Sequence, residues 1–225
     1  MRMLRRSVEL ALNARDEFWA TPENRTGRHR PLVAASIGPY GAFLADGSEY
    51  TGDYDLDGAG LAAFHRQRLE ILAGCGADLL ACETIPSAVE ARVLVDLLEE
   101  LPDSRAWISF SCRDRERICD GTQMAAVAAE VTRSPQVIAV GINCTAPGHV
   151  RSLISAARRA TAKPIVVYPN SGEEYDAEAK RWRQGETQPR FSEAAVQWVE
   201  EGARLVGGCC RTGPAEIRSL RRRLL

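Results

Sequence analysis

The segment VIAVGINC, residues 137–144, is an almost unbroken run of apolar residues that ends on Asn143 and Cys144. A strand covered on one face alternates apolar and polar residues, whereas a parallel strand covered on both faces is apolar throughout. The segment is therefore predicted to be a buried parallel strand with two polar side chains at its carboxyl end.

Five further segments have the same character. They are LVAASIG (32–38), ADLLACET (77–84), AWISFSC (106–112), PIVVYPN (164–170) and ARLVGGCC (203–210). Segments with helical periodicity separate them, and one also precedes the first strand. Such alternation requires a parallel sheet with right-handed crossovers. No linker interrupts it, so residues 1–225 are predicted to form a single domain.

Two α/β architectures satisfy this alternation, an open doubly wound sheet and an eight-stranded barrel. Polar residues follow each of the six strands, and a barrel builds its active site at that end of its strands. An open sheet would concentrate them at one switch point, and nucleotide-binding glycine motifs are absent. We predict a (β/α)8 barrel of the TIM type that is incomplete, with six strand–helix units present and the first two strands missing.

Composition limits the partners. The chain has 225 residues, a net charge of -1 and 26% charged residues, so no nucleic-acid surface is expected. It has neither an apolar run of membrane-spanning length nor a signal peptide, so we predict no membrane partner and a cytoplasmic location. In that compartment the seven cysteines are expected to be reduced, and four of them are assigned to packing or the surface. These four are Cys75, Cys82, Cys112 and Cys119.

The other three cysteines stand at strand ends. Cys144 closes one strand, and Cys209 and Cys210 close the strand two further on. In a barrel these ends converge on one rim, and three thiolates with an open fourth position make a catalytic zinc site. Two glycines before Cys209 allow a turn that would aim both neighbouring thiols at one point. Idle buried thiols and a strained disulfide between the neighbours are the alternatives.

These motifs resemble the homocysteine S-methyltransferases, a family of zinc-dependent barrel enzymes. The likeness covers essentially the whole chain and is densest in SIGPYGAFLADGSEYTGDY, ADLLACETIPS, VGINCTAP, VVYPNSGEEYD and RLVGGCCRTGP. The first of these is most similar to the branch that uses S-methylmethionine or S-adenosylmethionine as methyl donor. The resemblance implies that Cys144, Cys209 and Cys210 ligate Zn2+, and that Glu83 binds the substrate ammonium group.

The implied reaction methylates the thiol of L-homocysteine to give methionine. A thiol bound to zinc is deprotonated, and a sulfonium donor has a good neutral leaving group, so alignment matters more than acid–base help. No catalytic residue is expected beyond the zinc-bound substrate thiolate. His29, His65 and His149 are accordingly assigned to the surface or the core.

Other site candidates rest on local patterns. Asn143 and Asn170 lie at strand ends, where they would orient ligands or alternatively form turns. Without the resemblance, Glu83 would be expected in a salt bridge to an arginine. The long loop after the first strand offers Tyr40, Tyr50 and Asp53 to a sulfonium through cation–π and charge contacts, unless it is a solvated surface loop.

One departure from the family pattern keeps other functions open. Family members begin with a strand that carries an Asp-Gly motif and a second strand of small polar residues, and the chain has neither. Residues 1–225 would then be a partial homocysteine-binding barrel domain. The main alternative is a catalytically inactive barrel fragment or zinc-binding partner subunit, and a thiol-redox protein is a third hypothesis.

Overall fold

A computed structural model describes residues 1–176, 179, 181–183 and 191–225. Its centre is a six-stranded parallel sheet in the order β1-β2-β3-β4-β5-β8, so successive strands lie side by side. The strands are β1 (Ala34–Ile37), β2 (Leu79–Ile85), β3 (Ala106–Phe110), β4 (Val137–Asn143), β5 (Ile165–Tyr168) and β8 (Ala203–Val206). All six predicted strands are confirmed.

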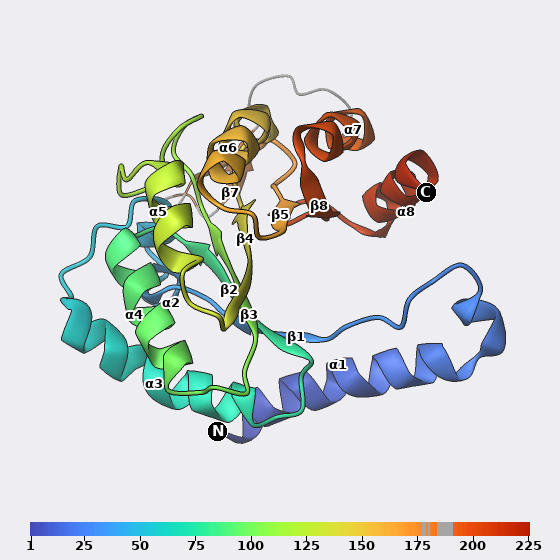
Figure 1. Cartoon of the computed structure of the whole chain (residues 1–225), viewed down its shortest axis with the longest axis horizontal. Helices are drawn as coiled ribbons and strands as arrows, with labels where there is room; N and C mark the ends of the chain where they lie inside the picture. Colours follow the sequence, from blue (N-terminus) through green and yellow to red (C-terminus); the bar gives the residue numbers. More distant parts are fainter. Residues whose placement is uncertain (177–178, 180, 184–190) are drawn as a thin grey trace.

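The sheet forms a partial barrel, as predicted (Figure 1). Within the described residues, β1 and β8 each pair with one neighbour and not with each other. The sequence reasoning missed one element, a short antiparallel hairpin of β6 (Glu174–Asp176) and β7 (Arg181–Arg183) between β5 and the next helix.

The helices lie mostly on the outer face of the sheet (Figure 1). They are α1 (Arg2–Ala20), α2 (Tyr40–Leu44), α3 (Gly58–Ala73), α4 (Ala88–Glu99), α5 (Met124–Val131), α6 (Pro147–Ala160), α7 (Phe191–Glu201) and α8 (Pro214–Leu224), with 3-10 turns η1 (Pro22–Arg25) and η2 (Ser48–Tyr50). Local signals start several of them: Asp57 accepts a hydrogen bond from Gly60 N at α3, and Pro214 occupies the first turn of α8. No helix among the described residues is long and apolar enough to cross a membrane.

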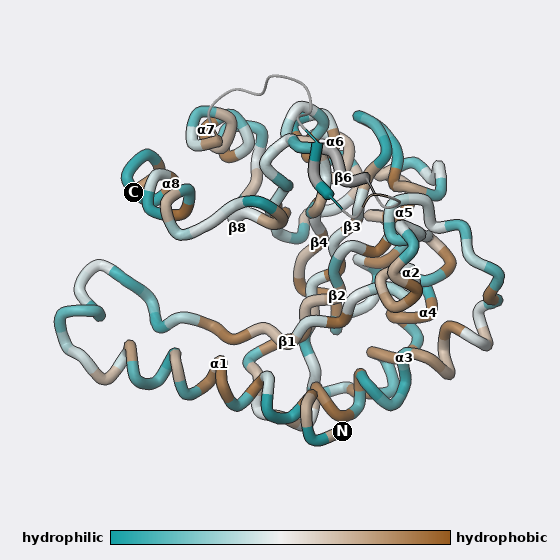
Figure 2. Tube along the Cα trace, turned by 180° about the vertical axis from the view of Figure 1, so that it is seen from behind, coloured by the Kyte–Doolittle hydropathy of each residue, from teal (hydrophilic) through white to brown (hydrophobic). Residues whose placement is uncertain are grey.

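The core fills the space between the sheet and these helices. Ile108, Phe110 and Ile142 on the strands and Leu94 and Leu98 on α4 are completely buried. Hydrophobic residues follow the strands in Figure 2, and hydrophilic residues mark the outer turns of the helices. Burial of each such side chain contributes roughly 1.5–3 kcal/mol. This packing fixes the strand ends on which the candidate site is built.

Candidate metal centre and substrate site

Three thiols meet at the carboxyl ends of the strands. Cys144 directly follows β4, and its Sγ lies 2.9 Å from the Sγ of Cys209 and 3.5 Å from that of Cys210. The Sγ atoms of Cys209 and Cys210, which follow β8, are 3.9 Å apart. In the described part of the chain this is the one cluster of at least three His, Cys, Asp or Glu side chains close enough to share a metal ion.

A turn after β8 brings the two neighbouring thiols to one side. Cys209 N donates to Pro169 O at 2.8 Å, and Thr212 N donates back to Cys209 O at 3.2 Å. A Cβ on Gly208 would lie 2.2 Å from Thr212 Oγ1, so only glycine fits under the Thr212 side chain. Cys144 itself has a left-handed backbone, with φ 47°, as its strand ends. The turn is the one that the two glycines predicted.

The three thiols influence one another's protonation. Hydrogen bonds from Cys144 and Cys209 lower the pKa of the Cys210 thiol to about 3, against the opposing effect of burial. Hydrogen bonds to Cys209 and Cys210 raise the pKa of the Cys144 thiol far above its usual value. One proton therefore leaves easily and the rest do not, because a second thiolate would lie beside the first. A bound metal cation would supply the positive charge that three thiolates need.

The remaining cysteines are packing residues, as predicted. Cys82, Cys112 and Cys119 are buried and Cys75 is partly buried, and all seven cysteines are free. Burial raises the pKa of Cys82 to about 12 and that of Cys119 to about 11. Thiols with such pKa values remain protonated near neutral pH and are poor nucleophiles.

Glu83 lies on β2 in a network of hydroxyl groups. Ser36 Oγ at the end of β1 donates to Glu83 Oε1 at 2.5 Å, and the Tyr168 hydroxyl on β5 donates to Glu83 Oε2 at 2.9 Å. Tyr168 in turn accepts from Trp107 Nε1 at 2.9 Å and lies 2.5 Å from Ser109 Oγ. Burial and the Glu83 charge raise the pKa of Tyr168. None of the ion pairs among the described residues includes Glu83, so its charge is met there by neutral donors.

Asn143 and Asn170 both hold backbone in place. Asn143 Oδ1 accepts from Thr84 N at 2.8 Å and its Nδ2 donates to Thr84 Oγ1 at 2.7 Å, which fixes the residue next to Glu83. Asn170 Oδ1 accepts from Gly172 N at 3.0 Å, so it forms the turn that the sequence left as an alternative to ligand binding. Asn143 thus holds Thr84, the residue that follows Glu83, in place.

The three donor-site residues predicted in the loop after β1 lie in different surroundings. The Tyr40 ring packs edge-on against Tyr54 and Phe64, and Asp53 is exposed. Tyr50 is the one near the thiols: burial, followed by the charges of the cysteine cluster, raises the pKa of its hydroxyl.

The sequence reasoning missed Ser36 and Tyr168 as partners of Glu83, and Ser109 as a partner of Tyr168. Each is a polar residue at or near the end of an otherwise apolar strand, and that interruption is the signal that could have found them.

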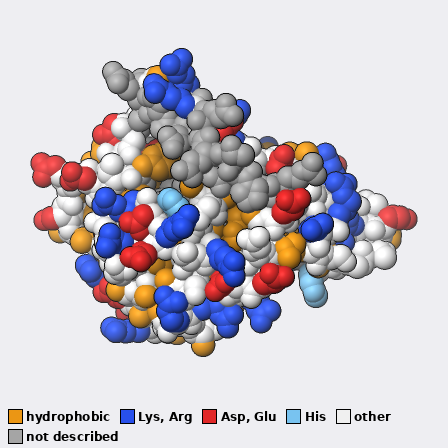
Figure 3. Space-filling model, turned by 90° about the horizontal axis from the view of Figure 1, so that it is seen from above, with side chains coloured by type: hydrophobic (Ala, Val, Ile, Leu, Met, Phe, Trp, Pro, Cys, Tyr) orange, Lys and Arg blue, Asp and Glu red, His pale blue; other side chains and the backbone are white. Residues whose placement is uncertain are grey.

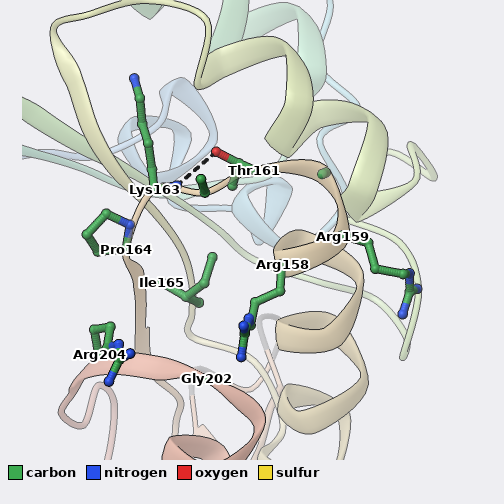
Figure 4. Close-up of a pocket in the computed structure, with 10 residues that line it drawn as sticks. Arg158, Arg159, Thr161, Lys163, Pro164, Ile165, Gly202 and Arg204 are labelled. Atoms are coloured by element: carbon green, nitrogen blue, oxygen red, sulfur yellow. Dashed lines mark hydrogen bonds between the residues drawn. The ribbon is translucent and has the colours of Figure 1, made fainter.

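A charged hollow lies at the other end of the strands. Thr161 and Lys163 before β5, and Gly202 and Arg204 at the start of β8, line it together with Arg158. Figure 4 shows Arg158 reaching from α6 toward Gly202. Barrel enzymes place their chemistry at the carboxyl ends of the strands, so this hollow is not the candidate site. Elsewhere Lys and Arg side chains are interspersed with Asp and Glu over the visible face in Figure 3.

Comparisons with known proteins agree with this geometry. The sequence profile of the homocysteine S-methyltransferase family matches residues 1–224. Homocysteine S-methyltransferase YbgG of Bacillus subtilis is 51% identical over 219 residues, which cover 97% of the chain and 70% of the relative. The Escherichia coli homocysteine S-methyltransferase is 48% identical over 223 residues, which cover 98% of the chain and 71% of the relative.

A solved structure matches the fold. The metallated form of the homocysteine methyltransferase MmuM from Escherichia coli superposes with a TM-score of 0.85 at 44% identity. The match covers 99% of the chain and 70% of the MmuM chain. With its partial barrel and its three thiols at the strand ends, the chain belongs to the homocysteine S-methyltransferase family.

Proposed function

We propose that the chain is a zinc-dependent enzyme that transfers a methyl group from a sulfonium donor to the thiol of L-homocysteine, giving methionine. The donor is S-methylmethionine or S-adenosylmethionine. The observation that carries the proposal is the convergence of Cys144, Cys209 and Cys210 at the strand ends. Its relatives' names and the metallated form of MmuM support it.

The thiol geometry fits zinc. Tetrahedral zinc with Zn–S bonds of about 2.3 Å places its sulfurs about 3.8 Å apart. Two of the three Sγ distances, 3.5 and 3.9 Å, are near this value, and the third, 2.9 Å, opens by less than about 1 Å on binding. Three cysteines leave one tetrahedral position for the substrate. Zinc in this site would keep the homocysteine thiol deprotonated at neutral pH.

Glu83 is proposed to bind the homocysteine ammonium group. Its carboxylate is partly buried, its described partners are the hydroxyls of Ser36 and Tyr168, and no cationic side chain among the described residues pairs with it. A buried carboxylate is stabilised by a cationic partner, which the substrate would bring. Asn143 contributes by holding Thr84 beside it.

The methyl step needs positioning alone. The homocysteine thiolate attacks the methyl carbon, a new S–C bond forms, and the sulfonium C–S bond breaks with its electron pair left on the departing sulfur. No proton moves in this step, so the site needs no general acid or base. The residues described above serve to hold two sulfur atoms in line with one carbon, which is an entropic advantage of binding.

The test is to purify the full chain with zinc and to measure both metal content and methionine formation with each donor. Cys209→Ser and Cys210→Ser should lose zinc and methyl transfer, whereas Cys75→Ser, remote from the site, should retain both. Absence of bound zinc would contradict the proposal. Zinc binding without methyl transfer would favour the alternative, an inactive barrel or partner subunit.

The proposed location is the cytoplasm, because all seven cysteines are free and three of them must stay reduced to bind zinc.

A further inference from the structure

Glu49 has a buried carboxylate oxygen without a partner. It lies in the short turn η2, and its Oε2 is inaccessible to solvent and has no hydrogen-bond partner among the described residues. None of the ion pairs formed by the described residues includes it. An unsatisfied buried polar atom is costly in a native structure and requires an explanation.

The backbone holds Glu49 firmly over the strand ends. Its carbonyl accepts from Ser111 Oγ at 2.9 Å, and the same hydroxyl lies 3.4 Å from Thr84 O, so Glu49 sits above β2 and β3. A Cβ on Gly41 would lie 2.5 Å from Glu49 N, so α2 packs directly against the turn. Asp46 accepts from Ser48 N at 2.9 Å and braces the other side. The backbone of Glu49 is therefore held in place at the strand ends.

Contacts also connect Glu49 with the strand ends that carry the thiols. Ser111 Oγ, which donates to Glu49 O, lies 3.4 Å from Thr84 O, and Thr84 N donates to the side chain of Asn143, the residue before Cys144. Glu49 therefore adds a negative charge among these strand ends, which form one region. Such a region attracts a cationic ligand.

We propose that Glu49, with Tyr50 beside it, binds the sulfonium group of the methyl donor. The inference rests on the proposed function and assigns the donor side of the same site. A sulfonium carries a positive charge without an N–H or O–H group, so it needs a nearby charge and an aromatic face and not a hydrogen-bond acceptor in a set direction. The ammonium of homocysteine already has a candidate partner in Glu83 on β2.

The assignment also gives the site a means of release. When the methyl group leaves, the donor sulfur becomes a neutral thioether and its attraction to Glu49 disappears. Glu49 therefore distinguishes donor from product by charge alone, which makes it a specificity-determining residue.

The test uses two ligand pairs that differ in the charge on sulfur. Calorimetric titration of the zinc-loaded full chain with S-methylmethionine and methionine, and with S-adenosylmethionine and S-adenosylhomocysteine, gives the preference for the charged member. For the donor that the enzyme uses, we expect about tenfold preference in the wild type and about twofold or less in Glu49→Gln. Asp55→Asn, an exposed acid on the same loop, should keep the preference.

Other outcomes overturn the assignment. If Glu49→Gln weakens charged and neutral members equally, Glu49 binds the ammonium group that both share. If it weakens neither, or if the wild type shows no preference, Glu49 does not bind the sulfonium. Methyl transfer by the wild type, measured in the same samples, tests the proposed function separately. Near-ultraviolet circular dichroism establishes that Glu49→Gln is folded.

Discussion

Asn143 and Thr84 form a two-way clamp, in which the Asn143 side chain accepts from Thr84 N at 2.8 Å and donates to Thr84 Oγ1 at 2.7 Å. Thr84 has a φ of 62°, a conformation that a β-branched residue adopts only under constraint. The pairing of β2 with β3 shifts register between Cys82 and Ile85 at the same place. The buried side-chain amide of Asn143 on β4 thus holds the irregular backbone of β2 at Thr84, which orients the neighbouring Glu83.

Asn143→Ala should therefore impair substrate binding as well as stability. Loss of both hydrogen bonds leaves Thr84 N unsatisfied, which we expect to cost about 1–3 kcal/mol of unfolding free energy in urea denaturation. The KM for homocysteine should rise more than kcat falls. Thr84→Ser, which keeps the hydroxyl, is the control and should stay close to wild type; an unchanged KM in Asn143→Ala would refute the clamp.

A second prediction concerns a buried carboxylate that anchors the loop after β1. Glu90 on α4 is completely buried; it accepts from Tyr40 N at 2.7 Å, lies 2.8 Å from His65 Nε2 and also binds the Tyr54 hydroxyl. Glu90→Ala leaves these groups unpaired and should cost at least about 3 kcal/mol in unfolding free energy. Glu99→Ala, exposed on the same helix, should change it by less than about 0.5 kcal/mol. Equal effects of the two substitutions would show that the anchor contributes nothing.

The sequence predicted the strands better than the contacts between them. An unbroken apolar run such as residues 137–144 indicates a strand that is buried on both faces, and this property can be read from the local sequence. The carboxyl ends of the predicted strands also placed the three thiols correctly. Pairs such as Asn143 with Thr84, 59 residues apart, leave no local pattern. For the same reason the sequence does not predict that the Tyr40 ring packs against Tyr54 and Phe64. His65 was assigned to surface or core, and it lies in the core.

The two glycines that precede Cys209 offer a matched pair of substitutions, one that disturbs the turn at the metal centre and one that does not. In Gly208→Ala the new Cβ would meet Thr212 Oγ1 at 2.2 Å, so the turn that carries Cys209 and Cys210 must shift. In Gly207→Ala the Cβ would meet only Tyr168 Cβ, at the ordinary distance of 3.5 Å. We expect zinc stoichiometry, measured by atomic emission after dialysis, to fall well below one for Gly208→Ala and to remain near one for Gly207→Ala. Full zinc retention by Gly208→Ala would show that the turn is not needed.

The last prediction tests how Glu83 is held. The Tyr168 hydroxyl donates to Glu83 Oε2 and accepts from Trp107 Nε1, so Tyr168→Phe removes one support of the carboxylate without changing the packing of the ring. Loss of one hydrogen bond to a charged group costs about 1.5–3 kcal/mol, and we expect the KM for homocysteine to rise by about tenfold or more. The KM for the donor should be unchanged, because Glu83 is proposed to bind homocysteine. Trp107→Phe, which leaves the Tyr168–Glu83 bond in place, should raise the homocysteine KM less. If Tyr168→Phe changed the KM for the donor and left the KM for homocysteine unaffected, Glu83 would be assigned to the donor instead of homocysteine.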